Sequence, residues 1–529
     1  MTSSAIIEYH QRTKHHLNGY AKGPAALDWD DQPSPFRHFH GSLSIQLPPP
    51  GGELSCSFGA LDHPETIPAQ DLSLANLGLL LELAFGLSAW KQYGPDRWAL
   101  RNNPSSGNLH PTVAYVICGE PDLLPPGVYH YDCYRHSLEQ RCLFRAASPA
   151  GVFIGLSSVH WREAWKYGER AFRYCQHDIG HALAGLGYAA AGLGWSVQLC
   201  DTLSDRQIAA WLGLDRAEDF IADEREHPDL ICRLLPAAAG RSSHGQTDAI
   251  PALPTEPPAA DWQGRAEPLG KHLYHWPVIT RAAEDSAKPA TPAAAWTPPL
   301  VPLPPPSADQ AASRIIRQRR SAQHYHPQAA ALPLADFHRI MLALLPNAKP
   351  PFSAWPWPPQ VDLCLFVHNV AGLVPGLYWF SRGGQDIEQT KTRMQANFAW
   401  QPQAAPYPLY LLIPGNVKKS AKTLSCHQDI AGDSAFSLGM LASFRDNIQA
   451  AAWNYRRLFW ECGLLGQILY LEAEAAGVRG TGIGCYFDDA LHGVLGLSDD
   501  AYQSLYHFTI GRPLTDNRLQ TLPPYQHLG

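Results

Sequence analysis

The chain has 529 residues, of which 17% are charged, and a formal net charge of -7. This length exceeds that of one ordinary domain and predicts two domains of similar size. The acidic balance, together with the lack of any long Lys- or Arg-rich tract, argues against nucleic acid as a partner.

Signals for targeting, disulfides and metals are weak in this sequence. Residues 1–8 lack a basic region followed by a long apolar run, and no uninterrupted apolar stretch reaches transmembrane length. We therefore expect a soluble, cytoplasmic protein with no membrane partner. The 11 cysteines contain no C-x-x-C pair, so we expect reduced cysteines packed as small hydrophobic side chains. The 24 histidines form no H-E-x-x-H motif and no ligand quartet, and we expect no metal.

The first part of the chain mixes strands and helices. Residues 112–117 predict a strand, and residues 126–131 predict a turn that enters a strand of alternating aromatic side chains. Residues 177–191 predict a long apolar helix, because hydrophobic side chains recur on one helical face. Glycine-rich residues 191–194 end this helix, and a Leu-Gly-Leu helix end follows at 212–214.

A change of composition separates this part from the next. Alanine and proline dominate residues 241–307. Proline breaks helices and removes the backbone donors that sheets need, so these residues predict an extended Pro/Ala-rich linker. A ligand for a proline-binding domain is the alternative, and a covalent tether is the favoured interpretation.

The last part of the chain repeats the order of the first. Residues 361–367 and 375–380 match the two strands, and residues 461–476 match the long helix. A glycine-rich end at 476–480 and a Leu-Gly-Leu sequence at 495–497 follow in the same order.

This duplication predicts the fold class and the domain organisation. We expect an α+β fold with two tandem domains, at residues 1–240 and 308–529, that pack about a pseudo-twofold axis within one chain. A pseudo-dimer of this kind needs no second chain, so a monomer is compatible with it.

Arg319-Arg320-Ser321 opens the second copy. Two guanidiniums and a hydroxyl suit a phosphate, because they offer forked donors, full charge and a neutral hydrogen bond. The alternative is a solvated basic helix end, since Arg314 and Arg317 lie close in the sequence.

Residues 101–111 of the first copy predict a fixed turn. Pro104 and Gly107 shape the turn, and Ser105 and Ser106 offer short hydrogen-bonding groups to a polar ring edge. A surface turn before a strand is the equally plausible alternative.

Two further segments carry candidate groups. Gly480-Thr481-Gly482-Ile483-Gly484 predicts a glycine-rich loop that lets the backbone approach a ligand closely. In the segment around Lys166-Tyr167, burial and the nearby Arg170 and Arg173 would disfavour the lysine ammonium. A neutral lysine or the adjacent tyrosine could then abstract a proton. A helix face with salt-bridged cations is the alternative.

Together these motifs resemble the nitroreductase-like flavoprotein superfamily and, more specifically, its SagB/ThcOx-type dehydrogenases. Residues 101–111, 166–181 and 10–14 resemble that branch, whereas residues 319–321 and 507–513 resemble the superfamily in general. The resemblance covers nearly the whole chain except the linker.

The resemblance implies an FMN site built from both copies. It assigns cofactor binding to Arg101, Pro104, Ser105, Ser106 and Gly107 of the first copy and to Arg319, Arg320, Ser321, Gln323, Gly482, Ile483, Gly484 and Arg512 of the second. It also implies that Lys166 and Tyr167 form the catalytic base.

The symmetry-related site is degraded in the sequence. Residues 351–358 carry Trp355 and Trp357 in place of the small polar turn. Gln449-Ala450 align with the Lys-Tyr pair, and Gln11-Arg12-Thr13 has one arginine instead of two. We therefore predict one FMN per chain.

Three functions remain open at this point. The first is an FMN-dependent dehydrogenase or oxidase that removes hydride and proton from a C–H next to nitrogen, as in azoline-to-azole oxidation of a small-molecule or peptide substrate. The second is an NAD(P)H-dependent reductase of nitroaromatics or quinones. The third is a non-catalytic flavin-binding scaffold in a biosynthetic complex.

Overall fold

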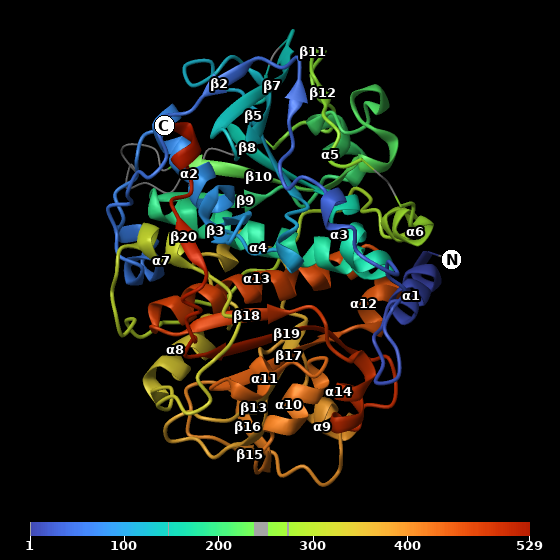
Figure 1. Cartoon of the computed structure of the whole chain (residues 1–529), viewed down its shortest axis with the longest axis vertical. Coiled ribbons are helices and arrows are strands. Elements are labelled where there is room, and N and C mark those ends of the chain that lie inside the picture. Colours follow the sequence, from blue (N-terminus) through green and yellow to red (C-terminus); the bar gives the residue numbers. More distant parts are fainter. Residues whose placement is uncertain (1, 147, 237–251, 272–273) are drawn as a thin grey trace.

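The computed structural model describes residues 2–146, 148–236, 252–271 and 274–529 (Figure 1). Two similar α+β halves stack on each other, with the first half at the top of Figure 1 and the second half at the bottom. Among the described residues, no helix combines the length and the apolar character needed to cross a bilayer.

The helices and strands have the following bounds. The helices are α1 (Thr2–Arg12), α2 (Leu74–Phe85), α3 (His160–Tyr167), α4 (Ala171–Gly192), α5 (Asp205–Leu212), α6 (Pro277–Asp285), α7 (Ala312–Gln318), α8 (Leu334–Ala343), α9 (Ile387–Arg393), α10 (Lys418–Leu424), α11 (Asp429–Asp433), α12 (Arg445–Ala450), α13 (Asn454–Ala475) and α14 (Asp488–Leu495). The strands are β1 (Phe39–His40), β2 (Ser44–Gln46), β3 (Leu87–Tyr93), β4 (Asp96–Arg101), β5 (Thr112–Cys118), β6 (Gly127–Asp132), β7 (Ser137–Phe144), β8 (Val152–Val159), β9 (Trp195–Leu199), β10 (Glu226–Pro236), β11 (Ala260–Trp262), β12 (Arg265–Ala266), β13 (Val361–Val367), β14 (Gly376–Phe380), β15 (Gln401–Pro402), β16 (Leu409–Pro414), β17 (Phe436–Ser443), β18 (Arg479–Ile483), β19 (Tyr502–Gly511) and β20 (Gln520–Leu522).

Six strands of each large sheet follow the same order, and the edge strands β11 and β15 differ in their place along the chain. The first sheet runs β11-β7-β6-β5-β8-β10-β9, and the second runs β15-β16-β14-β13-β17-β19-β18. All of these neighbours pair antiparallel. The shared order confirms the internal duplication and the α+β class that the sequence predicts.

The long helices α4 and α13 lie side by side between the two sheets (Figure 1). Each has 22 residues, and every residue of α4 is buried. The helices begin six and seven residues before the predicted starts at 177 and 461, at Ala171 and Asn454. The added turns carry arginines, which the apolar pattern does not count. Of these, Arg173 and Arg456 form ion pairs with the buried Asp488 and Asp229.

The halves exchange segments at their edges. Helix α1 of the first half packs on α12 of the second, and α7 of the second half packs on α2 of the first. Near the C-terminus, β20 pairs with β3, which lies in the first half. The two halves are therefore interlocked in space.

The predicted linker falls partly outside the described residues, since 241–251 and 272–273 are not among them. The described part is not wholly extended: β11 pairs with β7, β12 pairs with β1, and α6 packs on α1. Pro277 occupies the first turn of α6, where a backbone N–H has no helical partner to lose. The domain boundaries at 240 and 308 stay predictions.

Candidate functional site

A cavity of about 490 Å³ opens between the two halves, a size typical of sites for small molecules and cofactors. The first half lines it with Lys91, Trp98, Leu100, Pro104, Ser105, Ser106, Gly107, Asn108, His110, Tyr167, Tyr174, Asp178 and His181. The second half lines it with Arg319, Arg320, Ser321, Ala322, Gln323, Gln428, Tyr470, Arg479, Thr481, Gly482, Ile483, Gly484, Cys485, Tyr506, Pro513, Leu514, Thr515, Asp516, Leu519 and Thr521. The structure thus brings together most of the residues that the sequence analysis selected from the two copies.

The turn after β4 is held rigidly at one wall. Gly107, Asn108 and His110 have positive φ angles of 61°, 61° and 53°, which side-chain-bearing residues adopt only when the surroundings compensate. The His110 N–H donates to Ser105 Oγ at 2.8 Å, and Asn108 Nδ2 donates to the Ala99 carbonyl at 2.7 Å. These bonds fix the predicted residues of the turn against the cavity.

Arg319 and Arg320 reach across to the first half. Arg319 Nε donates to the Asn102 carbonyl and its Nη2 to the Arg101 carbonyl, both at 2.8 Å. Arg320 Nη2 donates to the Ser88 carbonyl at 2.9 Å. These bonds hold both guanidiniums at the cavity wall, although much of their donor capacity is used by backbone oxygens.

Four cations crowd this end of the cavity. Burial, together with Arg319, lowers the pKa of Arg320 to about 10. Burial also lowers the pKa of Lys91, and the charges of Arg320 and Arg479 lower it further. Glu474 lies 3.3 Å from Arg479 and offsets one positive charge. The mutual repulsion of the remaining cations would be relieved by a bound anion such as a phosphate.

The predicted glycine-rich loop is strand β18, which pairs with β19, so the expectation of a loop is wrong. Gly482 of β18 and Gly484 just after it make room for aromatic rings. A Cβ on Gly482 would lie 2.7 Å from Tyr506 Cζ, and one on Gly484 would lie 3.0 Å from Tyr174 Cδ1. The Gly482 N–H donates to Tyr470 Oη at 2.9 Å. Tyr470 Oη in turn shares a 2.8 Å hydrogen bond with Ser321 Oγ.

Two predicted binding residues do not line this cavity. Arg101 lies behind the turn, where it donates to the carbonyls of Thr112 and Pro35 and so holds the backbone. Arg512 is exposed and lines a separate cavity of about 100 Å³. Neither residue is part of the lining of this cavity, so direct contact of Arg101 and Arg512 with a cofactor stays a prediction that the cavity does not support.

Lys166 and Tyr167 end helix α3 beside the turn. A Cβ on Gly107 would lie 2.6 Å from Tyr167 Oη and 3.2 Å from Lys166 Cδ, so both side chains reach the turn. Lys166 Nζ lies 5.5 Å from the ring centre of Trp29 and 5.6 Å from that of Tyr167. Burial raises the pKa of Tyr167 well above its ordinary value, and nearby Glu163 adds to the shift. Tyr167 therefore stays a phenol at neutral pH.

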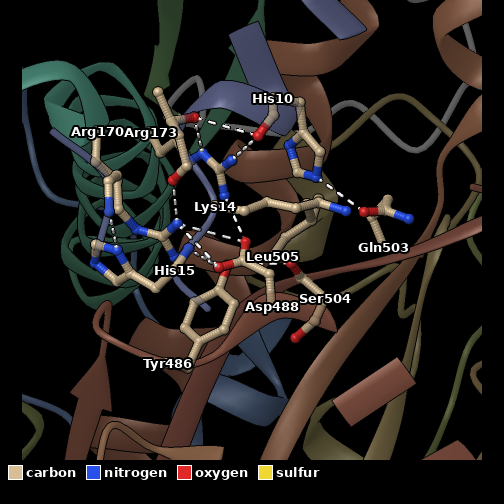
Figure 2. Close-up of polar contacts among 12 residues, drawn as sticks. His10, Lys14, His15, Arg170, Arg173, Tyr486, Asp488, Gln503, Ser504 and Leu505 are labelled. Carbon is tan, nitrogen blue, oxygen red and sulfur yellow. Dashed lines mark hydrogen bonds and ion pairs between the residues drawn. The ribbon is translucent and has the colours of Figure 1, made fainter. Parts of the chain in front are cut away.

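The arginines expected to act on Lys166 instead bind a carboxylate of the second half (Figure 2). Arg173 Nη1 lies 2.8 Å from Asp488 Oδ1, and Arg170 Nη1 lies 3.1 Å from Asp488 Oδ2. The His15 N–H donates to the same Oδ2 at 2.9 Å. Burial opposes the charge of Asp488, but the two guanidiniums outweigh it and lower the pKa of Asp488. The cluster locks the two halves together.

A buried carboxyl pair beneath the turn was not selected from the sequence. Ser105 Oγ donates to Glu163 Oε1 at 3.3 Å, and Asp178 lines the cavity. Burial raises the pKa of both carboxyl groups, and the charge of Asp178 raises that of Glu163 further. Two buried carboxyls this close retain a proton, which makes them a candidate proton store beside the cavity.

Lys91, Arg479 and Cys485 are further lining residues that the sequence analysis missed. They come from strand β3, the start of β18 and the segment after β18. No spacing in the sequence joins them, so only the fold shows their proximity.

The residues equivalent to a second site make other contacts. The rings of Trp355 and Trp357 are buried with centres 5.0 Å apart, and Trp453 lies 5.8 Å from Trp357. Arg12 Nε donates to Glu169 at 2.7 Å, and its Nη2 donates at 2.6 Å. Arg12, the single arginine of the first copy, is thus paired with the carboxylate of Glu169 in the same half.

One cluster elsewhere offers ligand atoms that a metal ion could use. His38, Asp132 and Glu139 place these atoms within 4.8 Å of one another. Arg135 Nη1 lies 3.6 Å from both carboxylates, so a guanidinium already supplies positive charge there.

Comparisons with known proteins place the fold. No family model matches the sequence, and no curated protein matches it. A candidate nitroreductase from Anabaena variabilis is similar in structure, with a TM-score of 0.69 and 21% identity, over 96% of this chain and 99% of that one. The chain therefore has the nitroreductase fold, in two tandem copies that form a pseudo-dimer.

Two other solved structures match shorter parts of the chain. A candidate nitroreductase from Ralstonia eutropha matches 43% of this chain and 99% of its own, with 15% identity and a TM-score of 0.29. The E. coli microcin synthetase McbBCD complex with truncated pro-MccB17 matches 38% of this chain and 70% of that one, with 14% identity and a TM-score of 0.28.

Proposed function

We propose that this chain is an FMN-dependent oxidoreductase with one composite flavin site. The observation that carries the proposal is the cavity itself, in which a cation cluster of the second half faces a rigid polar turn of the first. The nitroreductase fold and the resemblance of the sequence motifs to flavoproteins support the same cofactor.

The residues fit the two ends of FMN. The phosphate would be held by Lys91, Arg320, Arg479 and Ser321. The three cations suit an anion because Glu474 offsets only one of their positive charges. The turn at residues 104–107 and the glycines of β18 would hold the ring system, with Gln323 at the rim. Arg101 would act by fixing the turn, and Arg512 has no place in this set.

We further propose a dehydrogenase of the SagB/ThcOx type, acting on a C–H next to nitrogen in a small-molecule or peptide substrate. Bound FMN would supply the hydride acceptor. In its neutral form, Lys166 would take the accompanying proton at Nζ. Tyr167 is held as a phenol and would donate a hydrogen bond to the substrate. Azoline-to-azole oxidation is the archetype of this reaction.

An NAD(P)H-dependent nitro or quinone reductase is the second candidate. The Anabaena variabilis protein, which matches 96% of this chain in fold, is described as a candidate nitroreductase. Anaerobic addition of NADPH distinguishes the two candidates: rapid bleaching of the flavin supports the reductase, and a flavin that stays oxidised supports the dehydrogenase.

The absorption spectrum of the purified chain, with the flavin-to-protein ratio, tests the flavin proposal. We expect one FMN per chain, because the tryptophan cluster and the Arg12–Glu169 pair occupy the equivalent positions. A colourless protein with no affinity for added FMN would overturn the proposal and favour a scaffold. Two FMN per chain would overturn the single composite site.

A further inference from the structure

Two cysteines from distant parts of the second half meet beside the cavity. Cys426 follows helix α10 and Cys485 follows strand β18, and their Sγ atoms lie 2.7 Å apart. A disulfide has an Sγ–Sγ distance of about 2.05 Å, so the bond requires the atoms to approach by less than ~1 Å. Cys485 also lines the cavity.

The pair departs from the expectation that all 11 cysteines are packed as small hydrophobic side chains. Seven are buried, but Cys426 and Cys485 are half-buried, as are Cys56 and Cys200. A half-buried sulfur remains within reach of small reagents in solution, as thiol–disulfide exchange requires.

Hydrogen bonds and a constrained backbone hold the two cysteines in position. Gln428 Nε2 donates to the Cys485 carbonyl at 3.1 Å and to the Ser425 carbonyl at 2.9 Å, which joins the two segments. Cys426 and His427 have φ angles of 52° and 59°, in the left-handed region that residues with a Cβ disfavour. The surrounding contacts therefore impose this geometry on the pair.

The two sulfur atoms have different environments. The hydrogen bond with Cys426 lowers the pKa of Cys485 to about 5; burial opposes the shift, whereas His15 and Arg170 support it. The same hydrogen bond, together with burial, raises the pKa of Cys426. These shifts favour the thiolate at Cys485 and the thiol at Cys426, the division that thiol–disulfide exchange uses.

His15 is fixed as a hydrogen-bond donor to this thiolate. The Ala21 N–H donates to His15 Nδ1 at 2.9 Å, which leaves the proton of the neutral ring on Nε2. Burial lowers the pKa of His15 and keeps the ring neutral, and the side chain hydrogen-bonds Cys485. The bond from the His15 N–H to Asp488 sets the position of the residue (Figure 2).

We propose that Cys426 and Cys485 form a redox-active dithiol–disulfide pair that reacts with small-molecule disulfides. The Cys485 thiolate attacks one sulfur of the small disulfide, whose S–S bond breaks and releases one thiolate. The Cys426 sulfur then attacks the mixed disulfide at Cys485 and releases the second half, which takes the proton from Cys426. Two protein thiols are oxidised and one small disulfide is reduced, so electrons balance without another oxidant.

Equilibration of the full chain with mixtures of reduced and oxidised glutathione tests the pair, followed by alkylation and peptide mass mapping. We expect a Cys426–Cys485 linked peptide whose amount follows the glutathione ratio and reverses on reduction. The Cys200→Ser variant, which removes another half-buried cysteine, should form the same link. The absence of the linked peptide at the most oxidising ratio would overturn the proposal.

The single variants separate the two sulfur roles. In Cys426→Ser, we expect one glutathione to accumulate on Cys485, because the second attack is lost. In reduced wild type at about pH 6.5, Cys485 should alkylate before Cys56 and Cys200, since an ordinary thiol with a pKa near 8.5 is about 1% ionised there. Equal labelling of these cysteines would contradict the thiolate assignment. None of these readouts depends on flavin or turnover, so they can fail or succeed independently of the proposed function.

Discussion

Gly180 of α4 and Gly463 of α13 face each other where the two long helices cross. A Cβ on Gly463 would lie 3.0 Å from the Gly180 Cα, and one on Gly180 would lie 2.8 Å from the Leu464 amide nitrogen. The helices thus touch backbone to backbone at equivalent positions of the repeat. This contact sets the separation of the halves and, with it, the width of the cavity between them.

A methyl group at this crossing should destabilise the whole protein. We expect Gly463→Ala to lower the free energy of unfolding by about 1–3 kcal/mol, because the helix backbones cannot separate without disturbing the core. Thermal and urea denaturation measure the change. Gly493→Ala in α14 is the matched control, since a Cβ there meets nothing within 4 Å. Equal stability of the two variants would show that the crossing tolerates the methyl.

Lys91 should contribute to FMN binding through the phosphate alone. A lost charged hydrogen bond weakens binding by about 1.5–3 kcal/mol, so we expect Lys91→Gln to raise the Kd of FMN about 10–100-fold. The Kd of riboflavin, which has no phosphate, should change little. Fluorescence titration of both ligands measures the difference, with the exposed Lys419→Gln as control. A parallel loss for FMN and riboflavin would remove Lys91 from the phosphate site.

Lys166 should affect turnover and leave cofactor binding intact. We expect Lys166→Ala to lower the rate of substrate-dependent flavin reduction by about 10²–10⁴-fold, the usual value of a general base. The flavin spectrum and its stoichiometry should stay unchanged. Tyr167→Phe is the companion variant, since it keeps the ring and removes only the hydroxyl. Unaltered turnover in Lys166→Ala would exclude Lys166 from proton transfer.

The buried Asp178 should make stability fall as the pH rises. An aspartate of the unfolded chain titrates near pH 3.9, whereas burial raises the pKa of folded Asp178. Between these two pKa values the folded state binds more protons, so a rise in pH through this window costs stability. We expect Asp178→Asn to flatten the decline measured by urea denaturation between about pH 4 and pH 8.

Asp96→Asn provides the control for this pH series, since Asp96 is exposed on β4. Its pH profile should match that of the wild type. The same profile in Asp178→Asn would mean that Asp178 is ionised in the folded protein, contrary to the effect of its burial.

Short-range sequence patterns correctly predicted strands and helix ends, which depend on neighbouring residues in the chain. Strands β5 and β13 lie where the sequence predicts them, and the Leu-Gly-Leu sequences end helices α5 and α14 with Gly213 and Gly496 at φ angles of 69° and 78°. The tandem α+β arrangement is confirmed by the order that six strands of each large sheet share. These features depend on side-chain periodicity and turn chemistry, which a sequence displays directly.

Features that depend on tertiary contacts were predicted less well. The glycines of β18 suggested a loop, but they serve a strand against which Tyr506 and Tyr174 pack. Arg170 looked like a neighbour of Lys166, yet it binds Asp488 more than 300 residues away. In the same way, the approach of Cys426 to Cys485 depends on the segments after helix α10 and strand β18 meeting in space. No local pattern carries information about such distant partners.

The fusion of both halves in one polypeptide removes a constraint that binds homodimers. In a homodimer each substitution appears twice, so a tryptophan that blocks one interface site also blocks its twin. Here Trp355 and Trp357 occupy one side only, while Pro104 and Ser105 keep the small turn on the other. In a single chain of this kind, each half can carry substitutions that its counterpart lacks.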